Sequence, residues 1–333
     1  MDNNVAIQRL DWIDRLKGFA IFLMVMGHVI AWSFDSFDTI LASSNKDILV
    51  VWKFVYSFHM PLFMFCSGFL FFKGFEWFTV KNVGSIIWKR VQSLLVPYVC
   101  AGLLIFFYDG SEYKYWFLWY LFIFSVFTAV LFLFFSVLKI PYKKIVVSIT
   151  LVVISLVCYK LGGGPLFDDH LNFYLYFSLG IIYKMWKLEE RFLSNNLVYT
   201  ISIILFSFLF CLNMRGIGNI WMSMIISIAG INIFLIYFKN HFHAKHKIWE
   251  RLGKSSLQIY IIHFFFTVNI PSIGRYIIET QQQYGIASVV VIELVTSFFI
   301  SVLIVVLCFL VSEVIGKSDI LSRVFLGRSS KTA

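Results

Sequence analysis

The chain has 333 residues, of which 60% are hydrophobic and only 14% charged, and its formal net charge is +10. This composition excludes an ordinary soluble protein, because long apolar stretches fill nearly the whole sequence. It predicts an all-α, polytopic integral membrane protein, since each segment that crosses a bilayer must satisfy its own backbone hydrogen bonds.

Ten apolar stretches qualify as membrane-spanning helices, although the sixth and the ninth are short for a bilayer. All connecting loops are short, so we expect one membrane-embedded domain over residues 1–333 and no separate soluble domain. The predicted spans are 17–34, 54–73, 89–108, 116–138, 143–161, 171–187, 198–214, 219–238, 255–270 and 286–312.

Lysines and arginines alternate between the connecting segments. If the N-terminus is cytoplasmic, 22 of the 28 lysines and arginines fall on cytoplasmic segments. This is the positive-inside bias of membrane proteins, and it predicts that both termini are cytoplasmic. The bias also explains the positive net charge without a nucleic-acid partner.

The first span carries two ionisable residues on one predicted face. Lys17 stands where the chain enters the membrane, and His28 follows eleven residues later inside the apolar run. Eleven residues of α-helix rise about 16 Å and leave a net rotation of about 20°. With Lys17 at one edge of a core about 30 Å thick, His28 is expected near the middle of the membrane.

An ionisable side chain at that depth is a candidate functional site. Lys17 alone could be a cytoplasmic anchor, and His28 could be a core histidine bonded to another helix. We favour a catalytic role for His28. Desolvation favours the neutral imidazole, and a neutral imidazole can accept a proton from a hydroxyl.

A proline is expected to break the second span near its outer end. Pro61 lacks a backbone N–H and should release carbonyl groups around Ser57, and His59 lies beside this break. A simple kink with His59 at the membrane interface is an equally good interpretation. Ser67 and Gly68 are predicted to allow close helix packing.

Two further stretches each allow a structural and a functional interpretation. Lys89 and Arg90 mark the inner end of the third span, either as positive-inside anchors or as contacts for an anionic phosphate. Trp116 and Trp119 open the fourth span, either as part of an interfacial aromatic belt or as rings on which a sugar stacks.

The ninth span is short and carries Tyr260 one turn before His263. Tyr260 is explained by packing, whereas His263 again bears the cost of an ionisable group in the membrane. Glu293 in the last span is a candidate partner for a cation such as Arg275.

Five isolated cysteines predict neither disulfides nor a metal site. The three other histidines discussed, His241, His243 and His246, lie in a basic cytoplasmic loop and are expected to be solvated.

Taken in order, these stretches resemble the acyltransferase 3 family of integral membrane acyltransferases. The resemblance is to those members of the family that lack an SGNH-type hydrolase domain. One departure concerns the two arginines, about a turn apart, that family members often carry before a proline. Here Gln92 and Ser93 follow Lys89-Arg90. The matching stretches are Asp14–Gly18 leading to Gly27-His28, Phe58–Phe63, Ser67–Phe71, Val96–Tyr98, Trp116–Trp119 and Ile259–His263.

The resemblance implies transfer of an acetyl group from acetyl-CoA to a hydroxyl of a bacterial surface polysaccharide or its lipid-linked precursor. The protein would lie in the bacterial inner membrane and require no metal. Lys17, Lys89 and Arg90 would hold the CoA phosphates, and His28 would act as general base or transient acyl carrier. The expected contacts with the glycan acceptor are His59, Trp116, Trp119, Tyr260 and His263.

Two other classes of protein are alternatives. A secondary transporter or a flippase for lipid-linked saccharides would also use broken helices and buried ionisable groups, but the two halves of the chain show no matching interrupted helices. A membrane glycosyltransferase would be expected to carry a large loop with acidic residues, which the short loops do not provide. Nothing in the sequence specifies an oligomeric state.

Overall fold

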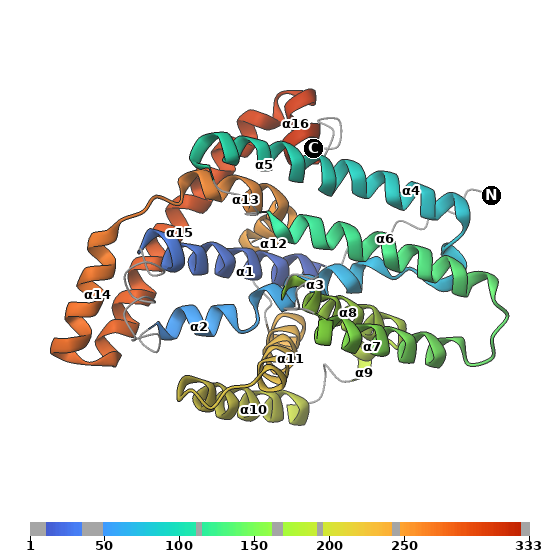
Figure 1. Ribbon diagram of the computed structural model, residues 1–333, viewed down its shortest axis with the longest axis horizontal. Coiled ribbons are helices and arrows are strands. Elements are labelled where there is room, and N and C mark those ends of the chain that lie inside the picture. Colours follow the sequence, from blue (N-terminus) through green and yellow to red (C-terminus); the bar gives the residue numbers. More distant parts are fainter. Residues whose placement is uncertain are drawn as a thin grey trace.

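The computed structural model describes residues 11–34, 49–110, 115–161, 169–191, 196–241 and 247–327, and all regular secondary structure within these ranges is helical (Figure 1). The all-α architecture predicted from composition is therefore confirmed. The described part leaves out both chain ends, Lys46, Lys114, His243, His246 and the side chain of His241.

Eight helical segments in the described ranges are long and apolar enough to cross a membrane. Two of them are interrupted, and each consists of two consecutive helices: α2 and α3 in one, α4 and α5 in the other. The segments are α1 (Asp11–His28), α2 (Val50–Tyr56) with α3 (His59–Phe71), α4 (Val80–Arg90) with α5 (Val96–Asp109), α6 (Trp116–Val137), α7 (Lys143–Leu161), α10 (Asn196–Met214), α11 (Ile220–Ile236) and α15 (Ile286–Gly316).

The two short predicted spans depart from simple transmembrane helices. The sixth consists of a 3₁₀ turn, η5 (Asp169–Phe173), and the 12-residue α8 (Tyr174–Met185). In the ninth, α13 (Ser256–Ile262) and η7 (His263–Phe266) meet α14 (Pro271–Tyr284) at a bend of 88°. The described residues thus contain eight spans, or nine with the bent pair, so the predicted count of ten is not confirmed.

Five further short elements connect or follow these helices. They are η3 (Phe75–Trp77), α9 (Leu188–Arg191), the π-helical turn η6 (Tyr237–His241), α12 (Ile248–Lys254) and α16 (Asp319–Leu326).

Helix α1 forms the centre of the bundle (Figure 1), where it contacts α3, α12, α13 and α15. In the α1 segment 83% of the most apolar window is buried inside the protein, compared with 11% in α10. The first span is therefore enclosed by protein, whereas α10 presents most of its surface outward. This is the location expected of a helix that carries functional side chains.

The second span is interrupted at the predicted position. Helix α2 ends at Tyr56 and α3 begins at His59, because Pro61 supplies no N–H and its ring crowds the carbonyl four residues earlier. That carbonyl, of Ser57, accepts a hydrogen bond of 2.6 Å from the Ser227 hydroxyl of α11. The break is thus stabilised by a neighbouring helix.

Helices α3 and α8 approach each other closely through two glycines. A Cβ atom on Gly68 would lie 1.9 Å from the carbonyl oxygen of Phe177, and one on Gly180 would lie 2.1 Å from that of Phe65. Any side chain at either position would collide with backbone. The prediction that Gly68 permits close helix packing is confirmed, and the contact explains how the short α8 is held.

Two of the helices widen into π-helical turns immediately after a candidate site residue. Segment η1 (Val29–Ser33) begins after His28, and η4 (Val91–Leu95) begins after Arg90. Such turns are rare and are frequently found at functional sites. The hydrophobic pattern of the sequence contains no sign of them.

Glu293 is fully buried in α15 and caps the beginning of α2. Its carboxylate accepts hydrogen bonds from the backbone N–H groups of Val51 at 3.1 Å and Trp52 at 2.9 Å. The first amides of a helix lack partners within that helix and favour a negative charge. The suggested pairing of Glu293 with Arg275 is therefore wrong, because a helix N-terminus takes the place of the cation.

Candidate active site

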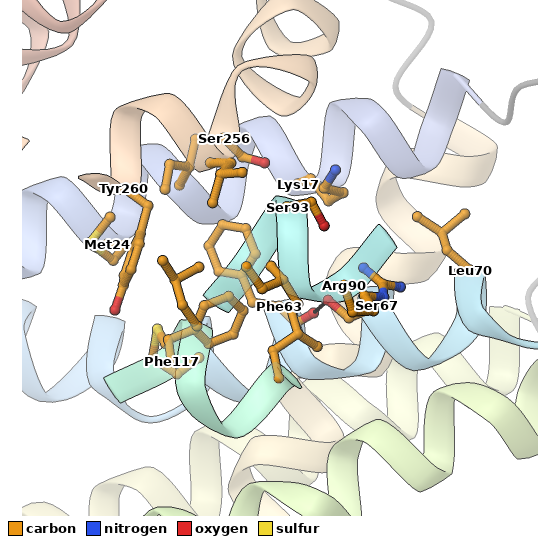
Figure 2. Close-up of a pocket in the computed structure, with 16 residues that line it drawn as sticks. Lys17, Met24, Phe63, Ser67, Leu70, Arg90, Ser93, Phe117, Ser256 and Tyr260 are labelled. Atoms are coloured by element: carbon orange, nitrogen blue, oxygen red, sulfur yellow. Dashed lines mark hydrogen bonds between the residues drawn. The ribbon is translucent and has the colours of Figure 1, made fainter. Parts of the chain in front are cut away.

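A cavity of about 290 Å³ lies between α1, α3, η4, α6 and α13. We call it the inner cavity. Figure 2 shows four of its polar side chains toward one end, where Lys17 and Ser93 lie near Arg90 and Ser67, whereas Ser256 lies nearer to Tyr260. Two cations and two hydroxyl groups thus converge from α1, α3, α4 and η4, which suits an anionic group with several acceptor oxygens.

The opposite end of the inner cavity is apolar and aromatic. Met24, Phe117 and Tyr260 are drawn at this end in Figure 2. The intervening wall is also apolar, with Ile21 and Phe63 among its side chains. The cavity therefore suits a ligand with a charged head and a long, weakly polar arm.

A second cavity, of about 320 Å³, is lined by two of the three candidate histidines, His28 and His59. We call it the outer cavity. Aromatic and imidazole rings dominate its wall, and six of the lining residues are His28, Trp32, His59, Trp116, His170 and Phe173. Planar rings with a few nitrogen atoms among them suit a ligand with both C–H faces and hydroxyl groups.

Met60 and Tyr260 line both cavities. These two side chains therefore stand between the charged end of the inner cavity and the histidines of the outer cavity. Because the cavities share part of their wall, a ligand arm lying in one reaches the boundary of the other.

One face of α1 runs past both cavities. Lys17, Ile21 and Met24 line the inner cavity and His28 lines the outer cavity. Their spacing of four, three and four residues is that of a single helix face. The predicted alignment of Lys17 with His28 is thus confirmed as geometry, and it places about 16 Å of helix between the two side chains.

His28 is hydrogen bonded to a second histidine. Its Nδ1 atom lies 2.8 Å from Nε2 of His263, whose own Nδ1 atom lies 3.1 Å from the carbonyl oxygen of Ile259. His263 is fully buried, whereas His28 is only partly buried. His263, expected to contact the acceptor, lies against His28 and is not among the residues that line the outer cavity.

His59 lies at the start of α3 with only 1% of its surface exposed. Its Nδ1 atom lies 2.8 Å from the carbonyl oxygen of Val55, near the helix break. A carbonyl only accepts hydrogen bonds, so Nδ1 is the protonated nitrogen of a neutral His59 ring. His59, Trp116 and Tyr260 line the outer cavity together with His28.

The two tryptophans of α6 have different surroundings. Trp116 lies against His170 with ring centroids 3.9 Å apart, and against Phe173 at 5.1 Å. Trp119 is 39% exposed and stacks on Tyr98 at 5.7 Å. Trp119 lines neither cavity described above. Of the two tryptophans predicted to contact the acceptor, only Trp116 therefore lines the outer cavity.

The basic residues near the inner cavity also differ. Arg90 lines the cavity, whereas its neighbour Lys89 is exposed and does not. Lys73, in the connection after α3, lies close enough for both to affect it. Burial and the positive charges of Lys89 and Arg90 lower the pKa of Lys73 below its ordinary value. Lys73 itself does not line the inner cavity, so these like charges lie near one another beside the one member, Arg90, that does.

Sequence reasoning did not identify Lys73, His170, Trp32 or Tyr56 as site candidates. His170 was detectable in principle as a histidine immediately before a short apolar stretch, and Lys73 as a cation at the end of the second span. Among the described residues no group of three histidine, cysteine, aspartate or glutamate side chains is arranged to hold a metal ion.

A multi-pass helical protein with a cavity that has cations at one end, beside a second cavity lined by histidines, has the features of a membrane-embedded transferase. A family model described as an acyltransferase domain (Acyl_transf_3) matches residues 10–313, nearly the whole chain. The protein therefore belongs to the acyltransferase 3 family and is a membrane acyltransferase. Neither a curated protein nor a solved structure gives a significant match. The family favours an acyltransferase over the transporter, flippase and glycosyltransferase alternatives.

Proposed function

We propose that this acyltransferase moves an acetyl group from acetyl-CoA to a hydroxyl of a bacterial surface polysaccharide or its lipid-linked precursor in the inner membrane. The observation that carries the proposal is the pair of adjacent cavities along one face of α1. The inner one has cations at its far end, the outer one has His28 in its wall, and Met60 and Tyr260 belong to both.

The inner cavity supports a CoA thioester as donor. CoA has phosphate groups at one end and a thioester at the end of a long pantetheine arm. Lys17 and Arg90 would bind phosphate oxygens through charge-assisted hydrogen bonds, and the apolar wall would enclose the arm. The thioester would then lie beside Met60 and Tyr260, at the boundary with the outer cavity.

The outer cavity supports a sugar as acceptor. Trp116 and Phe173 supply ring faces for the C–H face of a sugar, and His59 supplies an unprotonated Nε2 that can accept a hydrogen bond from a hydroxyl. Polysaccharides and their lipid-linked precursors carry such hydroxyl groups. The same chemistry would serve another exported glycan.

The reaction requires one proton to move twice. His28 would accept the proton of the acceptor hydroxyl on Nε2 while the hydroxyl oxygen attacks the thioester carbonyl carbon. The carbon–sulfur bond of the tetrahedral intermediate would then break, and the proton on Nε2 would pass to the departing thiolate of CoA. The ester and free CoA are the products, and His28 returns to its initial state.

Direct transfer is favoured over an acyl-histidine intermediate because the cavities adjoin, so donor and acceptor can bind together. The two routes differ kinetically. Direct transfer requires both substrates to be bound, whereas a transient acyl carrier gives ping-pong behaviour. Initial rates measured over a grid of donor and acceptor concentrations separate them.

The proposal is tested with native membranes that contain the protein. Radiolabelled acetyl-CoA is added, and label is measured in the polysaccharide and lipid-linked saccharide fractions. We expect label in one of these fractions, with His28→Ala lowering the rate by about 10²- to 10⁴-fold, the usual contribution of a general base. Trp119→Ala is the control for expression and insertion. Full labelling by the His28→Ala variant would disprove the assignment of the base, and label in neither fraction would disprove the acceptor class.

A further inference from the structure

A chain of two hydrogen bonds links His28 to the backbone of α13. It runs from Nδ1 of His28 to Nε2 of His263 over 2.8 Å, and from Nδ1 of His263 to the carbonyl oxygen of Ile259 over 3.1 Å. The final group of this chain is a carbonyl, which has no hydrogen to donate. It therefore makes Nδ1 of His263 the donor of the second bond and, when both rings are neutral, it also sets the direction of the first.

The direction follows from the number of protons on each ring. A neutral imidazole has one N–H, and in His263 it must be at Nδ1 to donate to Ile259. Nε2 of His263 then carries a lone pair and can only accept. The atom facing it, Nδ1 of His28, must be the donor, which leaves Nε2 of a neutral His28 without a proton.

We propose that His263 is a positioning residue that holds His28 in the tautomer whose Nε2 is unprotonated and can therefore take a proton from the acceptor. This inference rests on the proposed function for its catalytic meaning, but the tautomer itself does not. His263 is fully buried and does not line the outer cavity. It acts on the reaction only through the His28 ring.

The same contact serves His28 after it has taken the proton. His28 is then an imidazolium with N–H groups at both positions, and its Nδ1–H still donates to the lone pair of His263. No ring has to turn during the cycle, so the orientation of Nε2 is preserved until its proton passes to the CoA thiolate. A pre-oriented base of this kind avoids reorganisation during the reaction.

His59 provides an internal comparison. Its Nδ1 also donates to a carbonyl four residues earlier, that of Val55. His59 and His263 are therefore held in the same tautomer by the backbone of their own helices, whereas His28 is held by a side chain from a distant segment. A substitution at His263 can thus change the tautomer of His28 without removing a residue of the outer cavity.

The tautomer is measured by ¹⁵N NMR on protein labelled at histidine and reconstituted in lipid nanodiscs, without donor or acceptor. The His28 signals are assigned by their loss in His28→Asn. In the wild type we expect His28 to be protonated at Nδ1 and unprotonated at Nε2. A His28 ring protonated at Nε2 in the wild type would overturn the proposal. The assignment uses only His28→Asn, so this spectrum decides the tautomer even if a His263 variant fails to fold.

Two substitutions at His263 separate positioning from packing. His263→Leu fills the space but removes the acceptor for Nδ1–H, whereas His263→Gln retains an acceptor oxygen. For His263→Leu we expect a mixture of His28 tautomers and a fall in kcat of on the order of tenfold or more, with the KM for acetyl-CoA unchanged. His263→Gln should keep the wild-type tautomer and most of kcat.

Equal kcat values in His263→Leu, His263→Gln and wild type would overturn the positioning role. So would an unchanged His28 spectrum in a folded His263→Leu protein. Failure of the proposed function has a different signature, because wild-type membranes would then transfer no label from acetyl-CoA while the NMR spectrum still showed the bare Nε2.

Discussion

Met60 of α3 and Tyr260 of α13 are the two residues that line both the inner and the outer cavity. Under the proposed function, the acyl group that passes from donor to acceptor crosses the boundary that these side chains form. Their size therefore limits the group that can be held there. This relationship leads to a prediction about the acyl chain.

Met60→Ala should widen the boundary and admit a longer acyl group. We expect the ratio of the rates with butyryl-CoA and acetyl-CoA to rise about tenfold, since one or two methylene groups in a fitted pocket change discrimination by this order. Rates with the two donors are measured in the same membranes. Leu62→Ala, a change at a buried residue of α3 that lines neither cavity described above, is the control. An unchanged ratio in Met60→Ala would show that the boundary does not select the donor.

Arg90 and Lys89 form a matched pair for testing the donor site, because they are adjacent in sequence and only Arg90 lines the inner cavity. Hydrogen bonds to charged groups are worth about 1.5–3 kcal/mol, so Lys17→Met and Arg90→Met should raise the KM for acetyl-CoA by roughly 10- to 100-fold. Lys89→Met should raise it by a smaller factor. Steady-state kinetics over a range of acetyl-CoA concentrations measure this. Equal KM values for Arg90→Met and the wild type would remove Arg90 from the donor site.

Trp116 and Trp119 form a second matched pair, on one helix. Trp116 lines the outer cavity, whereas Trp119 stacks on Tyr98 and is 39% exposed. Trp116→Ala should weaken acceptor binding by about 1–3 kcal/mol, the order of an aromatic contact with its buried area. Acceptor KM values in both variants report this difference. A larger effect from Trp119→Ala would place the acceptor outside the outer cavity.

The contact between α3 and α8 predicts a large effect from one added methyl group. A Cβ atom at Gly68 would lie 1.9 Å from the Phe177 carbonyl oxygen, and such overpacking costs about 1–3 kcal/mol. Gly68→Ala should therefore lower the apparent Tm in detergent. The control is Gly102→Ala in α5, where a Cβ atom meets nothing within 4 Å. Removing glycine from a helix interior there should stabilise by about 0.5–1 kcal/mol. Equal shifts in both variants would argue against the close approach.

Features that depend on one segment could be predicted from the sequence. Helical periodicity is a local property, so it places Lys17 and His28 on one face. The missing N–H of Pro61 is equally local, and the second span breaks where predicted. Composition alone is enough for an all-α membrane protein. These predictions required no knowledge of which helices are neighbours.

Features that depend on contacts between distant segments could not be predicted from the sequence. His28 and His263 are separated by 235 positions in the chain, and no periodicity relates one to the other. Glu293 was matched with a cation because charges suggest ion pairs, whereas a helix N-terminus offers the same attraction through backbone amides. The count of spans exceeded the structural one for a related reason. Segment 171–187 is apolar because α8 packs against α3, and burial in protein produces the same composition as burial in lipid.

The face of α1 that holds Lys17, Ile21, Met24 and His28 has a consequence for donor choice. A helix is stiff, so the rise of about 16 Å between the backbone positions of Lys17 and His28 fixes the separation of the points where the two side chains are attached. Under the proposed function, a donor must span this separation between its negative charge and its reactive carbon. Acetyl phosphate, in which the two are adjacent, is too short to contact both Lys17 and His28. In the proposed site, acetyl-pantetheine would extend to His28 but would bring no phosphate to Lys17, so truncated thioesters are expected to be poor donors even though they carry the same acetyl group.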